Sequence, residues 1–418
     1  KLITDGEKKI VVLSAMSGTT NTLVEISDYL YKKNPEGANE IINKLETKYK
    51  QHIDELFATP EYKQKGLEII KSHFDYIRSY TKDLFTLFEE KVVLAQGELI
   101  STAMVNFYLQ ECGVKSVLLP ALEFMRTDKN AEPDPIYIKE KLLAQLELYP
   151  DADIYITQGF ICRNAYGEID NLQRGGSDYT ASLIGAAINA SEIQIWTDID
   201  GMHNNDPRIV DKTAPVRQLH FEEAAELAYF GAKILHPTCI QPAKYANIPV
   251  RLLNTMDPEA PGTLISNDTE KGKIKAVAAK DNITAIKIKS SRMLLAHGFL
   301  RKVFEIFESY QTSIDMICTS EVGVSVTVDN TKHLNEILDD LKKYGTVTVD
   351  KEMCIICVVG DLEWENVGFE AKALDAMRDI PVRMISFGGS NYNISFLIRE
   401  CDKKVALQSL SDMLFNGK

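Results

Sequence analysis

Residues 172–198 constrain the fold of this chain most, because a glycine-rich turn, a helix and a strand follow one another there. Gly175 and Gly176 precede the apolar run 180–188, which predicts a helix, and residues 191–198 form a strand-like run. A turn without side chains lets an anion approach the backbone N–H groups at a helix start. We therefore predict a βαβ unit whose helix N-terminus faces an anionic ligand.

Charged and hydroxyl side chains surround this turn. Arg174 precedes the glycines, and Ser177 and Asp178 follow them. A guanidinium group can hold a carboxylate or a phosphate through two hydrogen bonds. The alternative is an ordinary helix entry that Ser177 or Asp178 caps.

A polar loop follows the strand that ends near Thr197 and Asp198, and it contains Asp206 and Arg208. Open α/β sheets bind ligands beyond the carboxyl ends of their strands. These side chains are therefore expected to share one crevice with those that flank the glycines. The alternative for residues 206–208 is a plain β-turn.

Length and charge set the class of protein. With 418 residues the chain is long enough for two or three domains, and its formal charge of −13 disfavours a nucleic-acid or membrane-surface partner. No apolar run approaches the roughly 20 residues that span a bilayer. We expect a soluble, cytoplasmic protein.

The seven cysteines are scattered, so disulfides are not expected. Cys354 and Cys357 have the spacing of a zinc or redox pair, but they lie in the apolar run 353–359 with no second pair nearby. This run indicates a buried strand.

Several further segments predict an α/β fold with a mostly parallel central sheet. Residues 9–21 indicate a buried strand that runs into a small-residue turn, a second phosphate cradle. Residues 22–91 are typical of a helical insertion or lid, and 92–101 predict the start of another helix. Glu98 then lies in its first turn, either as a partner of the helix dipole or as a ligand-binding group.

Further strands are expected at 114–119 and 153–161, and a helix at 221–230. Lys233 follows this last helix and, taken alone, indicates a solvated cation at the helix end.

Seven motifs occur together in the order in which aspartate kinases of the amino-acid kinase fold carry them. They are VVLSAMSGTTN, GELIST, ITQGFI, LQRGGSDYTA, IWTDIDGMHNNDPR, AAELAYFGAKILHP and IPVRLLN. The chain thus resembles the monofunctional, lysine-sensitive members of that family. The resemblance implies phosphorylation of the side-chain carboxylate of aspartate by ATP with Mg²⁺, the first step toward lysine, threonine and methionine.

The resemblance also implies roles for individual residues. Catalysis is assigned to Asp178 and Arg174. Aspartate binding is assigned to Thr20, Glu98, Arg174, Gly175, Gly176 and Ser177. ATP binding is assigned to Ser14, Gly18, Thr197, Asp198, His203, Asp206, Arg208 and Lys233. No protein side chain is expected to ligate the metal, because Mg²⁺ bridges the nucleotide phosphates and keeps several waters.

Two features depart from the family pattern. The KFGGTS strand, whose lysine meets the transferred phosphoryl group in the family, does not precede Lys1. We expect this strand to lie outside the chain as given; the other reading is a protein that cannot catalyse normally. His203 stands where the family usually carries a tyrosine.

A proline- and glycine-rich passage at 257–273 marks a boundary, and two βαββαβ patterns follow it. They resemble paired ACT domains, which sense amino acids. The expected division is a catalytic domain at 1–272, a first ACT unit at 281–351, and a second ACT unit made of 273–280 and 352–418.

The first ACT unit resembles the effector site of lysine-sensitive aspartate kinases, although Ala296 stands where a serine is common. Lysine, or another aspartate-family amino acid, is the expected inhibitor. The expected effector residues are Met293, His297, Gly298, Phe299, Leu300, Ile314, Asp315, Thr319, Ser320 and Glu321.

The second ACT unit supplies only βαββα from its own segment, so its sheet lacks one strand. We expect residues 274–279 to fill an unpaired inner position of that sheet, because unpaired backbone groups are costly to bury. The first ACT unit is then inserted within the second. Such units usually associate side by side, so a homodimer or a dimer of dimers is expected.

Two other functions stay open. One is an amino-acid kinase that acts on glutamate or acetylglutamate, and the other is a catalytically impaired homologue that only senses amino acids.

Overall fold

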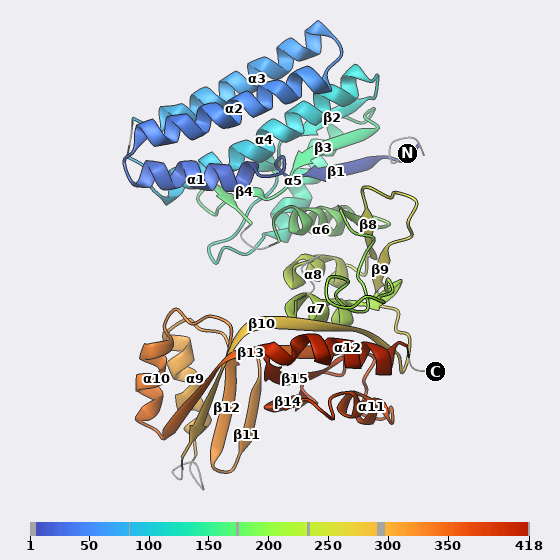
Figure 1. The fold of residues 1–418 in the computed structure, drawn as a ribbon. Helices are drawn as coiled ribbons and strands as arrows, with labels where there is room; N and C mark the ends of the chain where they lie inside the picture. The colour runs from blue at the N-terminus through green and yellow to red at the C-terminus, as the bar shows by residue number, and fades with distance from the viewer. Residues whose placement is uncertain (1–5, 83, 173–174, 232–234, 291–296, 417–418) are drawn as a thin grey trace. The chain divides into compact units, whose positions relative to one another are not determined.

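The computed structural model describes residues 6–82, 84–172, 175–231, 235–290 and 297–416. The chain divides into two compact units. One contains residues 1–193 and 238–248, and the other contains 194–237 and 249–418. Figure 1 labels the helices and strands along the chain.

A parallel sheet forms the centre of the first compact unit. It contains β1 (Lys9–Leu13), β3 (Ile154–Gln158) and β2 (Ser116–Leu119), in that spatial order. The middle strand β3 is buried throughout, as expected for 153–161. The prediction of a buried strand at β1 is wrong: β1 is half-buried, because it lies at the edge of this sheet.

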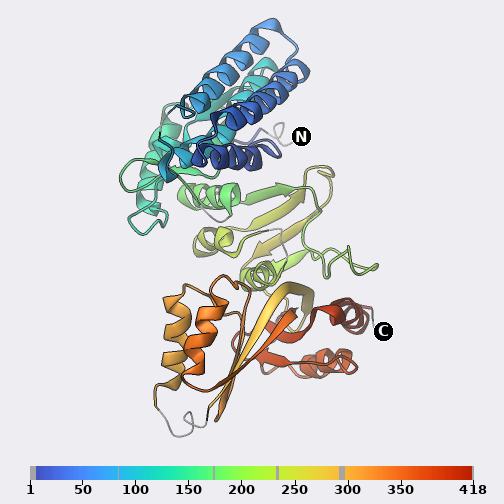
Figure 2. The same cartoon turned by 60° about the vertical axis from the view of Figure 1, so that its left-hand side comes forward.

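Four helices build a second core in the same unit. They are α1 (Thr19–Tyr31), α2 (Pro35–Leu56), α3 (Pro60–Ser79) and α4 (Leu87–Glu111). Proline opens α2 and α3, where its missing N–H costs nothing. Fully buried Tyr49 and Phe74 pack between the helices. The predicted helical segment at 22–91 is confirmed, and the blue and cyan helices lie side by side in Figures 1 and 2.

Helix α4 is the one described helix that is long and apolar enough to cross a membrane by length and composition. However, 72% of its apolar window is buried inside the fold. Such burial is typical of a core helix.

The other elements of the first unit surround the sheet. They are η1 (Ala121–Glu123), α5 (Pro135–Glu147), the hairpin of β4 (Ile161–Arg163) and β5 (Ile169–Asn171), α6 (Gly176–Ile188) and most of α8 (Pro237–Tyr245).

The second compact unit begins with a four-stranded mixed sheet. Its strands are β6 (Ile193–Thr197), β8 (Val250–Asn254), β9 (Thr263–Ser266) and β7 (Gln218–His220), in that spatial order. Helix α7 (Phe221–Tyr229) follows β7 and starts at a capping box of His220 and Glu223.

The rest of this unit is a six-stranded antiparallel sheet with helices at both ends. Its strands are β11 (Ile317–Ser320), β12 (Gly323–Val328), β10 (Ile274–Lys289), β13 (Thr346–Gly360), β15 (Asn393–Arg399) and β14 (Met384–Phe387), in spatial order. Its helices are α9 (Phe299–Ser309), α10 (Leu334–Lys342), α11 (Phe369–Ala376), η3 (Glu400–Asp402) and α12 (Lys403–Leu414). Figures 1 and 2 show α9 and α10 at one end of the sheet and α11 and α12 at the other.

The long strands β10 and β13 each run through two hydrophobic cores. Residues 283–289 pair with 346–353 in the core that contains α9 and α10, and residues 274–280 pair with 355–360 in the core that contains α11 and α12. The predicted pairing of 274–279 with the second ACT unit is therefore confirmed.

The position of this strand within the second ACT unit differs from the prediction. It lies beside β13, whose other neighbour is β15, so it is an end strand and not an inner one. The N–H of Val277 donates to the carbonyl of Asn204 (2.9 Å), a residue between β6 and β7. Part of this sheet edge is therefore covered.

The predicted buried strand at 353–359 is confirmed. Cys354 and Cys357 lie fully buried on β13, and burial raises the pKa of both thiols. Both are free cysteines, so this run is a core strand.

Candidate functional site

The loop between β1 and α1 approaches α4 and α6 in the first compact unit. Ser14 Oγ lies 2.7 Å from Ser177 Oγ on α6, and Ser101 Oγ on α4 donates to the Ser14 carbonyl (2.8 Å). Gly18 adopts a left-handed conformation (φ 81°), and α1 begins directly after it with Thr20 in its first turn. The loop is thus fixed from two sides.

Glu98 lies in the middle of α4, and its side chain is buried. The N–H of Ala15 donates to Glu98 Oε1 (3.3 Å), whereas Oε2 has no partner among the described residues. Burial raises the pKa of Glu98 to about 7, although the Ala15 N–H acts in the opposite direction. A buried carboxylate with a free oxygen is suited to a cationic group.

The prediction that Glu98 lies in the first turn of a helix is wrong. Helix α4 begins at Leu87, after a capping box in which the Thr86 N–H donates to Glu89 Oε2 (2.8 Å). Because the helix dipole acts within the first turn, it does not explain Glu98. The close contact between Ala15 and α4 depends on Gly97, because a Cβ at position 97 would lie 2.8 Å from Ala15 Cβ.

Two glycines start helix α6. Gly175 is the N-cap residue in a left-handed conformation (φ 82°), and Gly176 is the first helical residue (φ 43°). Ser177 and Asp178 therefore lie inside the first turn, and the alternative that either caps the helix is wrong. Burial raises the pKa of Asp178 to about 6. Arg174 lies outside the described residues.

Gly159 explains the close contact between β3 and this helix start. A Cβ at Gly159 would lie 2.4 Å from Ser177 Cβ and 2.7 Å from its Cα. The next residue, Phe160, has a positive φ of 68°, and its N–H donates to Thr180 Oγ1 (3.0 Å). The sequence analysis did not assign Gly159 a role, although it lies in the ITQGFI motif.

The first compact unit thus combines groups of two kinds. The buried carboxylate of Glu98 can receive an ammonium group, and the helix start at Gly175 to Ser177 offers N–H groups to an anion. A ligand with both charges, such as an amino acid, matches this combination.

Replacing Glu98 with glutamine is expected to stabilise the ligand-free protein at high pH. The folded state raises the pKa of Glu98 from 4.5 to about 7, so its stabilising contribution is present below pH 4.5 and is lost as the pH rises to 7. A neutral amide avoids this cost. We expect Glu98→Gln to gain at most about 3 kcal/mol over wild type at pH 8, and clearly less at pH 5.

Urea unfolding at both pH values measures the difference. Glu147→Gln, an exposed change on α5, serves as the control. An equal effect of Glu98→Gln at the two pH values would contradict the burial argument.

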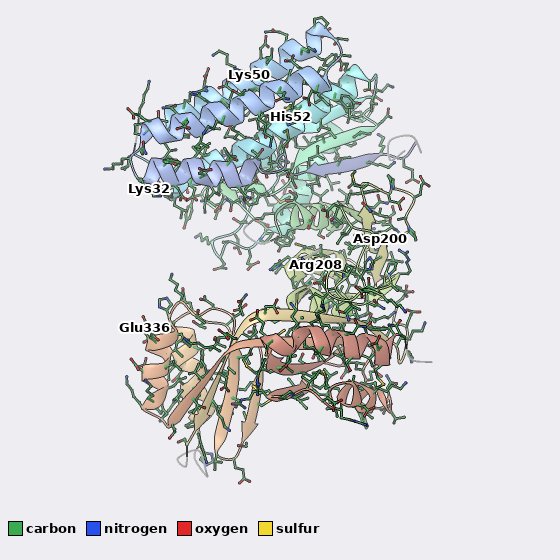
Figure 3. The ribbon with its side chains drawn as sticks, in the orientation of Figure 1. Lys32, Lys50, His52, Asp200, Arg208 and Glu336 are labelled. Carbon is green, nitrogen blue, oxygen red and sulfur yellow. The ribbon has the colours of Figure 1, made fainter. Side chains whose placement is uncertain are left out.

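The predicted nucleotide loop lies in the second compact unit and is held by its own contacts. Asp206 accepts from Arg208 Nε (2.9 Å), from Arg208 Nη2 (2.7 Å) and from the Arg208 N–H (2.9 Å). This pairing keeps the pKa of Asp206 below its usual value. Residues 206–208 therefore form the tight turn that was the alternative to a nucleotide contact. The Arg208 side chain is 80% exposed, and Figure 3 labels it.

Thr197, Asp198 and His203 lie on the same segment, whereas Ser14 and Gly18 lie on the loop between β1 and α1 in the first compact unit. Thr197 ends β6, and its Oγ1 lies 2.6 Å from the Asp198 nitrogen, which donates to it. His203 uses both ring nitrogens within the loop, toward Asp200 Oδ1 (2.7 Å) and Thr213 Oγ1 (3.1 Å). Lys233 lies outside the described residues.

The predicted effector residues belong to the first ACT unit. Thr319 and Ser320 lie on β11, Gly298 caps α9 in a left-handed conformation (φ 81°), and Phe299 is buried. His297, Leu300 and Glu321 are exposed, Ile314 is half-buried, and Met293 lies outside the described residues.

Asp315 has partners that the sequence analysis did not find. Its side chain is 0% exposed, and Oδ1 accepts from Lys280 Nζ (2.7 Å) and from the Tyr229 hydroxyl (2.9 Å). Asp315 Oδ2 is buried without a partner in the described part of the chain. Tyr229 and Asp315 are 86 residues apart, so no local pattern predicts their contact.

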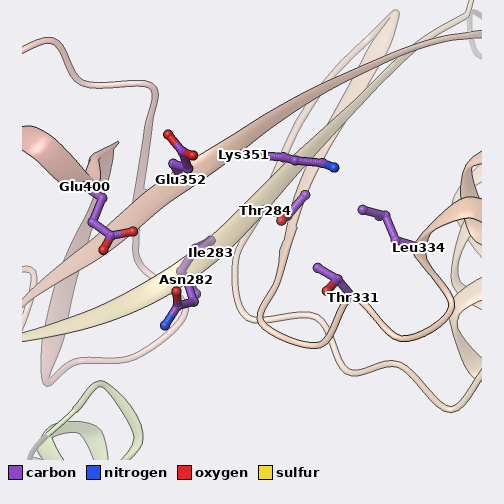
Figure 4. A pocket seen from close by; sticks show the side chains of 8 residues that line it. All are labelled: Asn282, Ile283, Thr284, Thr331, Leu334, Lys351, Glu352 and Glu400. Atoms are coloured by element: carbon purple, nitrogen blue, oxygen red, sulfur yellow. The ribbon is translucent and has the colours of Figure 1, made fainter.

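A cavity of about 250 Å³ lies where β10 and β13 pass from one ACT unit to the other (Figure 4). Its lining includes Asn282, Thr284, Lys351, Glu352 and Glu400. None of these residues belongs to the predicted catalytic or effector sets, so this cavity is separate from both.

Comparison with known proteins gives the same assignment for nearly the whole chain. Residues 1–254 match the amino acid kinase family model, and residues 356–414 match an ACT domain model. The chain is 35% identical to chloroplastic aspartokinase 1 of Arabidopsis thaliana, over 98% of this chain and 75% of that protein. It is 32% identical to lysine-sensitive aspartokinase 3 of Escherichia coli, over 99% and 94%.

Two solved structures of E. coli aspartokinase III are also similar. The complex with aspartate and ADP has a TM-score of 0.84 at 31% identity, covering 99% of this chain and 94% of that one. The complex with lysine and aspartate has a TM-score of 0.80 at 32% identity and the same coverage.

Proposed function

This chain belongs to the aspartokinases of the amino acid kinase family, and we propose that it transfers a phosphoryl group from ATP to the side-chain carboxylate of L-aspartate. The product is 4-phospho-L-aspartate, and the reaction opens the synthesis of lysine, threonine and methionine. The observation that carries the proposal is the free, buried oxygen of Glu98, which the loop between β1 and α1 links to a glycine-rich helix start, in a chain related to aspartokinases over almost its full length.

Binding of aspartate follows from its charges. Glu98 pairs with the ammonium group, and Arg174 holds the α-carboxylate through its planar fork. Gly175, Gly176 and Ser177 bring backbone N–H groups toward the same anion. Thr20 lies in the first turn of α1, after the loop that Ser14 fixes to Ser177, which supports its place near the substrate.

The chemical step needs little from the protein beyond alignment. An ionised carboxylate is already a nucleophile, so no general base is required, and the protein orients the groups and neutralises phosphate charge. Asp178 organises the reacting groups. Since its pKa is about 6, it is mostly ionised at pH 7 and becomes neutral in acid.

ATP is the phosphoryl donor, and we assign its contacts to Ser14, Gly18, Thr197, Asp198, His203, Asp206, Arg208 and Lys233. Mg²⁺, when bound with ATP, would supply neutralisation of phosphate charge. The described residues contain no group of three or more His, Cys, Asp or Glu that could hold a metal ion.

An acyl-phosphate assay tests the function. The protein with its native N-terminus is incubated with ATP, Mg²⁺ and one of aspartate, glutamate or acetylglutamate, and the product is trapped with hydroxylamine. We expect a hydroxamate with aspartate. A product only with glutamate or acetylglutamate would favour another amino-acid kinase, and no product with any substrate would favour the impaired sensor.

Lysine is the proposed inhibitor, and it binds the first ACT unit. Lys280 faces both Asp315 and Asp329 (2.7 and 2.9 Å), so one cation opposes two carboxylates. The cluster has a net negative charge and an unpartnered buried oxygen, which an ammonium group would satisfy. The start of α9 after Gly298 would receive the effector carboxylate. We also propose that the ACT units join the chain into a homodimer or a dimer of dimers.

Thr319→Ile is expected to weaken inhibition by lysine. Thr319 lies exposed on β11, and the larger side chain would crowd the proposed effector surface. We expect the half-inhibitory lysine concentration, measured relative to the uninhibited rate of the same variant, to rise at least about tenfold, a loss of about 1.4 kcal/mol of binding. Thr331→Ile, an exposed change elsewhere in the first ACT unit, is the control. An unchanged value would place the effector site elsewhere.

A further inference from the structure

Tyr229 forms a direct contact between the catalytic segment and the first ACT unit. It is the last residue of α7, and its hydroxyl donates to Asp315 Oδ1 at 2.9 Å. Helix α7 lies within the residues that match the amino acid kinase family, whereas Asp315 precedes β11. Tyr229 therefore hydrogen-bonds to Asp315, the same carboxylate to which the ammonium group of the effector is assigned.

The backbone that follows α7 packs against the same strand as this contact. Gly231 has a positive φ of 122°, and a Cβ there would lie 2.2 Å from the Ala279 carbonyl oxygen on β10. The neighbouring Lys280 places its Nζ 4.5 Å from the centre of the Tyr229 ring. The end of α7 is thus fixed to β10 through both backbone and side chain.

The charges around Tyr229 make its contact sensitive to a ligand. The side chain of Asp315 is 0% exposed, and its Oδ1 already accepts from both Lys280 and Tyr229. A further cation at Oδ2 would draw electron density from the carboxylate and weaken the bond that Oδ1 accepts from the phenol. The hydrogen bond of Tyr229 therefore depends on whether Asp315 has a second cation.

We propose that Tyr229 is the positioning residue through which the effector on Asp315 acts on the catalytic domain. This inference rests on the proposed function, because it assigns the route of regulation for that effector site. When the ammonium occupies Asp315, the hydrogen bond that joins Tyr229 at the end of α7 to the first ACT unit weakens. Lys233, to which ATP binding is assigned, follows the end of α7 by four positions in the sequence, so substrate binding is the expected readout of the change.

Linkage provides the test. If two ligands are coupled, each changes the binding constant of the other by the same factor, typically about 5- to 150-fold. The dissociation constant of lysine is measured by calorimetry on the full chain, with and without saturating aspartate and a non-hydrolysable ATP analogue. In wild type we expect the substrates to raise this constant at least about fivefold. In Tyr229→Phe we expect a change of less than about twofold.

The Phe variant removes one oxygen from a side chain that is 43% exposed, so folding is expected to be retained. Tyr166→Phe, at a tyrosine 76% exposed, is the matched control and should keep the wild-type ratio. A wild-type ratio in Tyr229→Phe would overturn the inference. A wild type that forms no acyl phosphate would instead overturn the proposed function.

Discussion

Glu98→Gln is expected to lower kcat/KM for aspartate by about 100-fold and to leave the KM for ATP within about twofold of wild type. The reason is the environment of the carboxylate, which is 3% exposed and has one oxygen without a partner among the described residues. An amide keeps the shape but cannot balance the ammonium charge of the substrate. Steady-state kinetics with each substrate varied in turn measure kcat/KM for aspartate and the KM for ATP separately.

The same residue predicts a pH dependence. Because the pKa of Glu98 is about 7 in the free protein, the carboxylate is ionised above pH 7 and neutral below it. The KM for aspartate should therefore fall as the pH rises through 7 in wild type but not in Glu98→Gln. Arg174→Ala should weaken aspartate use in the same way, while ATP binding survives. A near-normal KM for aspartate in both variants would remove these residues from the substrate site.

Gly159→Ala is expected to abolish activity, with a loss of more than about 100-fold in kcat/KM for aspartate. The new Cβ would overlap Ser177, including its Cα at 2.7 Å, so the start of α6 has to move away from β3. A shift of this size separates Ser177 from Ser14, whose hydroxyls are 2.7 Å apart. Overpacking of this kind also costs about 1–3 kcal/mol of stability.

The control for this variant is Gly389→Ala. Gly389 lies in the second ACT unit, and a Cβ there has no atom within 4 Å. Acyl-phosphate kinetics and urea unfolding are measured on both variants. An active Gly159→Ala enzyme with wild-type aspartate KM would show that the position of Ser177 does not matter for the substrate.

The sequence predicted features that local patterns determine. Hydrophobic periodicity predicts the strand within 9–21, and the glycines at 175 and 176 predict the start of the following helix. A count of strands predicts that residues 274–279 join the sheet of the second ACT unit. The position of Glu98 could not be obtained in this way. The apolar helix α4 continues five residues upstream of the predicted start at 92, and only the capping box at Thr86 marks its true beginning.

Contacts between distant segments account for most of what was missed. Tyr229 and Asp315 look like unrelated polar residues in the sequence, and their pairing depends on how α7 packs on β10. Gly159 looks like an ordinary residue after a strand, but it is required by the approach of Ser177. Asp206 and Arg208 are only two residues apart, so their pairing is local. It agrees with the β-turn that was the alternative for residues 206–208.

The continuous strand β10 also has a consequence for folding during synthesis. Its first half leaves the ribosome before the first ACT unit but pairs with residues 355–360, which are made only after that unit is complete. The strands of the first ACT unit can pair as soon as residues 346–353 have been made. The first strand of the second ACT unit stays unpaired until residues 355–360 have also been made. Because distant pairings form slowly, this exposed strand is the segment for which chaperone protection matters most while the protein is being made.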